Sequence, residues 1–282
     1  MNLHLDKSKV ESQKSKVKIT GSKSETNRLL LLQALYPTIS LENTSNSDDS
    51  EVMQKALTGN GEIVDIHHAG TAMRFLTAYF AVNQGREVVL TGSQRMTERP
   101  IKVLVEALQQ LGAQITYEKE EGYPPIRIKG QKITAHKVSI PANVSSQYIS
   151  ALLLVAPKLE NGIELTLVGE ITSVPYINMT LALLNDLNIQ TSFIGNVITV
   201  HPKKEVETKV MTVESDWSSA SYFFSLVALA KTASITLTSY KENSLQGDSA
   251  LAEIYKDFGV ETIFNDNKSI TISKINRHNL QP

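Results

Sequence analysis

A short polar cluster that opens directly into an apolar helix occurs four times in this chain, and this pattern restricts the fold more than any other feature. The four segments are GSKSETNRLLLLQAL at 21–35, GTAMRFLTAYFAV at 70–82, SSQYISALLLVA at 145–156 and SSASYFFSLVALA at 218–230. From the second copy onward they begin about 75 residues apart. A fixed spacing of this kind predicts that the chain is built from repeated structural units.

The segments between the clusters repeat as well. Each cluster helix is followed by a β-rich run, REVVLTGS, IELTLVGE or SITLTSY, and then by a second helix. The second helices end at Gly112, Asn188 and Gly259, residue types that suit a left-handed C-terminal cap. A hairpin then closes each unit: AQITYEK with IRIKG, QTSFI with VITVH turning at 195–196, and ETIFN with SITIS turning near 266–267.

The unit is therefore predicted to be β-α-β-α-β-β, present four times in an α/β (α+β) fold. The first copy is abridged, because only about 49 residues separate Gly21 from Gly70, and we expect it to lack hairpin residues around 58–62. Stacking into a solenoid is an alternative. Mixed helices and hairpins instead favour globular domains of three units each, with helices packed inside sheets.

Charge and cysteine content exclude several classes of function. The 28 basic and 29 acidic residues give a net charge of -1, so no global field attracts nucleic acid or an anionic membrane. The absence of cysteine excludes disulfides, thiolate metal sites and a cysteine nucleophile, and a reducing cytoplasm fits. The polar N-terminus lacks the apolar segment of a signal peptide, and no apolar run approaches the length of a membrane span. We expect a cytoplasmic protein in which any anion site is built locally.

The octet GSKSETNR is the first candidate site. A helix N-terminus presents unpaired N–H groups and a positive dipole end, which favour anions. Capping requires one hydroxyl, whereas this octet adds Lys23 and, one turn beyond Ser24, Arg28. These residues predict a phosphate or carboxylate site. For Ser218 and Ser219, in contrast, simple N-capping is the favoured interpretation.

A second candidate site lies in HHAGTAMRFL and in TGSQRMTERP, about 20 residues further on. Gly70 and Thr71 at a helix start can bring the backbone close to a ligand. Arg95 has no adjacent acid and is the better ligand candidate, whereas Arg99 is as well explained by pairing with Glu98. Pro100 is expected at the first position of the next helix.

His67 and His68 resemble half of a metal site, but no third ligand is spaced near them, so zinc is disfavoured.

These motifs together resemble the 5-enolpyruvylshikimate-3-phosphate synthase family. GSKSETNR is similar to the opening signature of that family, and AGTAMR, LTGSQRMTERP, SSQYISALLLVAP, VPYIN, SSASYF and NSLQGD resemble its later motifs in the same order. The resemblance implies six β-α-β-α-β-β units in two domains that close on substrates. It therefore implies a first domain at 20–214 and an incomplete second domain formed by 1–19 and 215–282.

The resemblance also implies roles for individual residues. It implies contacts with phosphoenolpyruvate for Lys23, Gly70, Thr71 and Arg95. For shikimate 3-phosphate it implies that Ser24 and Arg28 hold the ligand, Arg28 through its carboxylate, and that Ser145 and Ser146 cradle its phosphate. Gln147 is implied to reach both substrates, and Ser173 and Tyr176 to complete the pocket. His68 and Phe75 stand where the family usually has asparagine and proline, so we expect a shifted helix beside the phosphoenolpyruvate site.

The implied reaction transfers the enolpyruvyl group of phosphoenolpyruvate to the 5-hydroxyl of shikimate 3-phosphate, a step of aromatic amino acid biosynthesis. The resemblance implies no metal or organic cofactor, and a monomer at full length. It places the catalytic carboxylates in units beyond Pro282. Two hypotheses follow: a transferase represented by its N-terminal two thirds, and a non-catalytic protein that binds shikimate 3-phosphate. We expect truncation, and no turnover by this chain alone.

Overall fold

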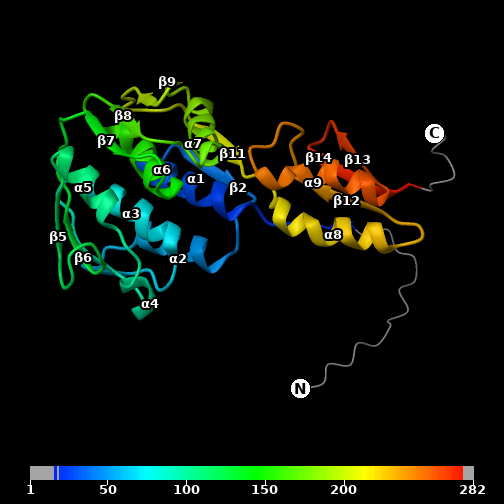
Figure 1. The fold of residues 1–282 in the computed structure, drawn as a ribbon, viewed down its shortest axis with the longest axis horizontal. Coiled ribbons are helices and arrows are strands. Elements are labelled where there is room, and N and C mark those ends of the chain that lie inside the picture. The colour runs from blue at the N-terminus through cyan, green and yellow to red at the C-terminus, as the bar shows by residue number, and fades with distance from the viewer. Residues whose placement is uncertain (1–15, 18, 276–282) are drawn as a thin grey trace, which may run out of the picture.

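The computed structural model describes residues 16–17 and 19–275, and it divides them between two hydrophobic cores. One core is formed by residues between Leu29 and Val213, and the other by Ile19 together with residues between Trp217 and Ile272. Figure 1 shows the two bodies side by side along the long axis of the molecule, with α8 and β12–β14 in the smaller one.

Three sheets share one strand order, which is the structural form of the sequence repeat. In each, a parallel pair of strands carries an antiparallel hairpin on its second strand. In the first two sheets a cluster helix joins the parallel pair, whereas in the third the residues of the larger core lie between the two strands in the sequence. The first sheet contains β3 (Ile63–Asp65), β4 (Glu87–Thr91), β6 (Ile126–Lys129) and β5 (Gln114–Tyr117), in that order. The second contains β7 (Lys137–Pro141), β8 (Ile163–Val168), β10 (Val197–Val200) and β9 (Thr191–Ile194). The third contains β1 (Lys16–Val17), β12 (Ser234–Thr238), β14 (Ser269–Lys274) and β13 (Val260–Asn265).

The predicted repeat, its hairpins and its helix ends are confirmed. All three predicted hairpins form, and the predicted cap residues Gly112, Asn188 and Gly259 have φ of 101°, 57° and 72°. The first copy is shortened as expected. Its strand β2 (Ile39–Glu42) has no hairpin and pairs in parallel with β11 (Lys209–Thr212).

Helices of two kinds accompany the sheets. The cluster helices are α1 (Lys23–Leu35), α3 (Gly70–Val82), α6 (Ser146–Val155) and α8 (Trp217–Leu229). The others are α2 (Asp48–Thr58), α4 (Gln94–Thr97), α5 (Lys102–Gln110), η1 (Ala156–Lys158), α7 (Val174–Asp186), η2 (Gly247–Ala250), α9 (Leu251–Ile254) and η3 (Tyr255–Phe258). Among the described residues, no helix is long and apolar enough to cross a membrane.

Three local predictions are wrong. The N-cap of α8 is Asp216, whose carboxylate accepts hydrogen bonds from the N–H and the hydroxyl of Ser219, so neither predicted serine is the cap. The second helix of the last unit is broken into η2, α9 and η3, none of which has a buried residue, so packing does not stabilise a continuous helix there. Pro100 precedes α5 by two residues, and its carbonyl accepts a hydrogen bond from Tyr148 (2.7 Å).

The two connections between the cores lie side by side. Gly21 forms an isolated antiparallel bridge with Ser215, and the N–H of Ser22 donates to the carbonyl of Glu214 at 2.8 Å. A Cβ atom on Gly21 would lie 2.0 Å from the carbonyl oxygen of Asn43, so the chain can cross here only without a side chain.

The cluster helices of the two cores differ in burial. Every residue of α1 from Glu25 to Leu32 is buried, whereas α8 is buried only at Trp217, Ala220, Phe224 and Val227 and exposes Tyr222, Leu226 and Leu229. We propose that 20–214 is one cooperative unit, and that 215–282 with 1–19 forms a second, less stable one.

Hydrogen exchange is expected to follow this division. Amides of 217–272 are expected to exchange faster than those of 29–213, because fewer apolar contacts oppose their local opening. Amide hydrogen exchange read by mass spectrometry measures this, with peptides from α6 as the internal reference. Equal protection of both parts in a monomer would contradict the division.

Candidate functional site

Arg28 is the centre of the candidate site. It lies on α1, its side chain is 3% exposed, and its guanidinium contacts three other helices. Nε donates to Thr180 Oγ1 on α7 at 2.8 Å, and one terminal nitrogen donates to Ser150 Oγ on α6 at 3.0 Å. The rings of Phe75 on α3 and Tyr176 on α7 lie 5.5 and 5.8 Å from the guanidinium carbon.

None of these partners carries a negative charge, and among the described residues Arg28 forms no ion pair. Burial lowers the pKa of Arg28 to about 10, while the nearby Tyr176 and Glu25 oppose this shift, so the side chain remains a cation at neutral pH. A buried cation with neutral partners retains a large unscreened field. The hydrogen-bond partners of Arg28 therefore orient its guanidinium without forming an ion pair with it, as a site for a ligand anion requires.

A second contact joins α3 to α6 on the same side of α3. Gln147 Nε2 donates to Thr71 Oγ1 at 3.2 Å. Thr71 lies one helical turn before Phe75, which contacts Arg28, so the two contacts belong to one continuous face of α3. The predicted residues of the octet and those of the SSQY segment therefore meet through α3.

Arg99 lies directly against the start of α3. A Cβ atom on Gly70 would be 2.5 Å from a terminal nitrogen of Arg99, so a side chain at position 70 would displace the guanidinium from this place. No ion pair between Arg99 and Glu98 forms among the described residues, and this correction makes Arg99 a ligand candidate beside Arg95. Both arginines line one hollow with His68, Ser93 and Met96. This hollow presents two guanidinium groups and no carboxylate, which suits an anion.

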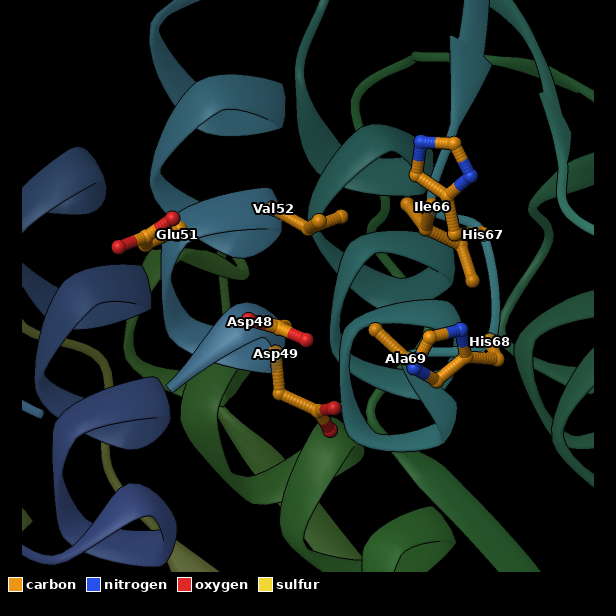
Figure 2. A pocket seen from close by; sticks show the side chains of 8 residues that line it. All are labelled: Asp48, Asp49, Glu51, Val52, Ile66, His67, His68 and Ala69. Carbon is orange, nitrogen blue, oxygen red and sulfur yellow. The ribbon is translucent and has the colours of Figure 1, made fainter. Parts of the chain in front are cut away.

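Lys23 lies against α2. Its Nζ is 4.0 Å from the carboxylate of Asp49 on α2, and its side chain is 52% exposed. Figure 2 shows Asp48 and Asp49 facing the segment of His67 and His68 across a neighbouring hollow. In the part of the chain that the structure describes, no group of three or more His, Asp or Glu side chains is placed to hold a metal ion.

Helix N-termini provide further donors. The N-caps of α1, α3 and α7 are Ser22, Ala69 and Ser173, and none of them makes a side-chain capping bond. At α6, Ser145 Oγ accepts from the N–H of Gln147 at a long 3.4 Å. First-turn N–H groups without a side-chain cap are available to an anionic ligand.

The sequence model of the EPSP synthase (3-phosphoshikimate 1-carboxyvinyltransferase) family matches residues 38–281. The chain belongs to the EPSP synthase family. A relative from Bacteroides fragilis (strain YCH46), named 3-phosphoshikimate 1-carboxyvinyltransferase, is 45% identical over 254 residues, which are 90% of this chain and 62% of the relative. A protein of the same name from Actinobacillus pleuropneumoniae serotype 5b is 38% identical over 287 residues, 89% of this chain and 65% of that protein.

EPSP synthase from Acinetobacter baumannii has the same fold. Its structure matches with a TM-score of 0.73 at 21% identity, over 93% of this chain and 64% of that one. The predicted family and fold class are confirmed. This member of the EPSP synthase family spans about 62% of the length of the Bacteroides fragilis relatives that it matches.

The structure connects some predicted site residues of this EPSP synthase family member and leaves others apart. Arg28 contacts the ring of Tyr176 and donates a hydrogen bond to the backbone carbonyl of Ser24, and Gln147 donates to Thr71. Arg95 lies in the neighbouring hollow, and Gly70 lies beneath Arg99. Lys23 points to Asp49. Among the described residues, no side-chain contact joins Ser145, Ser146 or Ser173 to Arg28. Their roles, like those of the other predicted site residues, stay predictions.

Sequence reasoning missed the residues that hold Arg28. Ser150 is a hydroxyl within the apolar run of α6, and Thr180 lies one turn after Tyr176 on α7. A polar residue in an otherwise apolar helix is the signal that identifies Ser150. Nothing in the sequence joins either residue to Arg28, which is 122 and 152 positions away.

Proposed function

We propose that residues 1–282 form the shikimate 3-phosphate-binding part of a 3-phosphoshikimate 1-carboxyvinyltransferase. The observation that carries the proposal is the buried guanidinium of Arg28, which forms no ion pair among the described residues and is held by hydroxyl groups and aromatic rings at the meeting point of four helices. The names of the relatives support the choice of substrates. The cytoplasmic location and the monomeric full-length state stay predictions.

The reaction requires two anionic substrates to lie together. The 5-hydroxyl of shikimate 3-phosphate gives its proton to a base and adds to C2 of phosphoenolpyruvate, while an acid donates a proton to C3. The resulting tetrahedral intermediate then loses inorganic phosphate as C3 gives up one proton. In our proposal Arg28 binds the carboxylate of shikimate 3-phosphate, Ser24 and Tyr176 line the same pocket, and Ser145 and Ser146 receive its phosphate.

The second hollow is our proposed phosphoenolpyruvate site. Arg95 and Arg99 supply cationic donors there, while Gly70 and Thr71 supply the start of α3. Bidentate arginine–carboxylate and arginine–phosphate contacts fix orientation as well as affinity. Gln147, which donates a hydrogen bond to Thr71 at the start of α3, is proposed to contact both substrates. Lys23 completes the phosphoenolpyruvate site by leaving Asp49 when the substrate arrives.

Titration calorimetry of the chain with shikimate 3-phosphate and with shikimate tests the proposal. We expect shikimate 3-phosphate to bind, and shikimate to bind at least tenfold more weakly, because it lacks the charge-assisted phosphate contacts, each typically about 1.5–3 kcal/mol. Inorganic phosphate alone serves as the control for non-specific anion binding. No binding of shikimate 3-phosphate, or equal affinity for the two compounds, would contradict the proposal, and absence of binding would also exclude the non-catalytic binding protein.

A further inference from the structure

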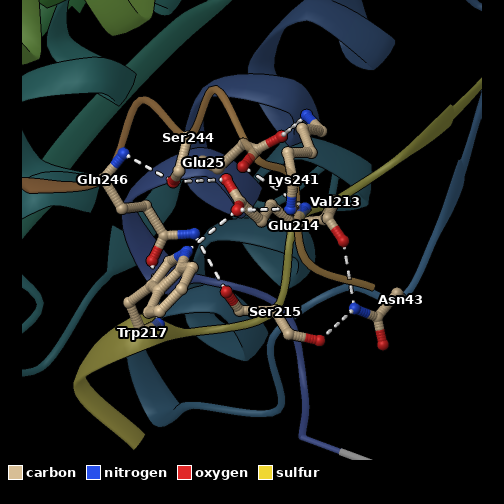
Figure 3. A network of polar contacts seen from close by, with 9 residues as sticks. All are labelled: Glu25, Asn43, Val213, Glu214, Ser215, Trp217, Lys241, Ser244 and Gln246. Carbon is tan, nitrogen blue, oxygen red and sulfur yellow. Dashed lines mark hydrogen bonds and ion pairs between the residues drawn. The ribbon is translucent and has the colours of Figure 1, made fainter. Parts of the chain in front are cut away.

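Two buried carboxylates lie where the chain crosses between the cores, and no step of the proposed reaction uses them. Glu214 is 2% exposed and Glu25, in the first turn of α1, is 4% exposed. Figure 3 shows that both belong to one network with Lys241, Ser244 and Gln246. Burying two acids is costly unless each has several partners, so the network requires a physical explanation.

Glu214 binds the segment that follows β12. Its Oε1 accepts hydrogen bonds from the backbone N–H of Lys241 at 3.0 Å and from Nε1 of Trp217 at 2.9 Å, and its Oε2 accepts from the hydroxyl of Ser244 at 2.8 Å. One carboxylate therefore fixes two points of residues 241–248, a segment that we call the strap, against the start of α8.

Glu25 ties the same strap to the other core. Its Oε1 is 3.5 Å from Nζ of Lys241, and its Oε2 accepts from the backbone N–H of Glu214 at 3.3 Å. Burial raises the pKa of Glu25, and Lys241 opposes this effect, while the neighbouring Glu214 adds to it. The ion pair thus holds a carboxylate of α1 and a lysine of the strap together across the junction between the cores.

The end of the strap reaches the proposed substrate pocket. Gln246 is anchored by its side chain, which accepts from the N–H of Trp217 at 3.1 Å and donates to the carbonyl of Ser215 at 3.0 Å. Residues 245–248 then line a hollow whose opposite wall includes Ser24 and Tyr176. The network therefore connects directly to a surface that both cores build.

We infer that Glu25 and Glu214 are positioning residues that hold the strap at the N-terminal end of α1, so that residues 245–248 form the second wall of the shikimate 3-phosphate pocket. The identity of the ligand rests on the proposed function. The attachment of the strap rests only on the contacts around the two carboxylates. The two claims are separable by experiment.

Two accessible substitutions test the inference, because Lys241 and Ser244 are only partly buried and the chain is expected to fold without their side chains. Lys241→Met removes the ion pair while retaining the backbone N–H that Glu214 binds. Ser244→Ala removes one hydrogen bond to Glu214 and also the acceptor of the Gln246 N–H. Lys241→Arg is the conservative variant that is expected to restore the pair. Glu253→Gln, which alters an exposed acid of the same core, is the matched control.

Hydrogen exchange and calorimetry are the two measurements. In Lys241→Met and Ser244→Ala we expect amides of 241–248 to exchange at least tenfold faster, peptides of α6 to be unchanged, and shikimate 3-phosphate to bind at least tenfold more weakly. Lys241→Arg and Glu253→Gln are expected to stay within twofold of the parent chain in both measurements.

Each contrary result has a definite meaning. Unchanged exchange of the strap in both variants would overturn its attachment by the carboxylates. Faster exchange with unchanged affinity for shikimate 3-phosphate would overturn its role as a pocket wall. If the parent chain does not bind shikimate 3-phosphate, the proposed function fails, and the exchange data still decide whether the carboxylates hold the strap.

Discussion

Phosphate release from phosphoenolpyruvate that depends on shikimate 3-phosphate is expected to be at least about 100-fold slower with residues 1–282 alone than with the chain extended to the length of its relatives. The chain spans 62% of the Bacteroides fragilis protein. The hollow that contains Arg95 and Arg99 has no carboxylate among its lining residues. Loss of one positioned acid or base typically costs about 100- to 10,000-fold in rate.

The measurement is inorganic phosphate against time with both substrates present. Three proteins are compared: residues 1–282, a fusion of these residues to the remaining segment of the Bacteroides fragilis relative, and that fusion carrying Lys23→Ala. A fusion carrying Lys129→Ala, an exposed lysine on β6, is the matched control. We expect turnover by the fusion and by its Lys129→Ala variant, and a large loss with Lys23→Ala. Turnover by residues 1–282 alone would require an acid and a base within this sequence.

Arg28→Ala is expected to weaken binding of shikimate 3-phosphate by about 1.5–3 kcal/mol, the range for a hydrogen bond to a charged group. The structure shows why the loss is expected to be this large. Among the described residues Arg28 forms no ion pair that would compete with a ligand anion, and its charge lies in a desolvated environment. Arg28→Lys retains the charge without the planar guanidinium, so we expect affinity between those of the parent chain and Arg28→Ala.

Calorimetry gives the affinities, and thermal unfolding shows whether each variant is folded. Arg127→Ala, at an exposed arginine on β6, is the matched control and is expected to leave affinity unchanged. Thr180→Val provides a second test that does not remove the charge of Arg28. It takes away the hydroxyl that accepts a hydrogen bond from Arg28 Nε and leaves the guanidinium free to reorient. Equal affinities of the parent chain, Arg28→Ala and Thr180→Val would remove Arg28 from the site.

Much of the fold could be predicted from local sequence patterns. The position of each cluster helix, the three hairpins and the left-handed ends at Gly112, Asn188 and Gly259 depend on periodicity and on backbone conformations that only a few residue types adopt easily. The octet around Lys23 and Arg28 was identifiable for the same reason, since a helix start with extra cationic groups has a recognisable composition.

Which segments meet was decided only by the tertiary structure. The sequence contains nothing that pairs β1 with β12 or β2 with β11, because burial and sheet register select strand partners that are far apart in the chain. The same holds for the site. Arg28 is fixed by Ser150 and Thr180, and Glu25 by Lys241.

Local patterns in the sequence therefore determined the repeated elements and the helix starts suited to anions. These features depend on hydrogen bonds and conformational preferences within a few residues, so a short stretch of sequence is sufficient to predict them. The packing of α1 against α3, α6 and α7 decided which residues hold Arg28 without forming an ion pair with it. The junction between the cores decided which residues hold the strap. Such contacts arise only when distant segments are buried together, because desolvation makes each buried polar group depend on its partners.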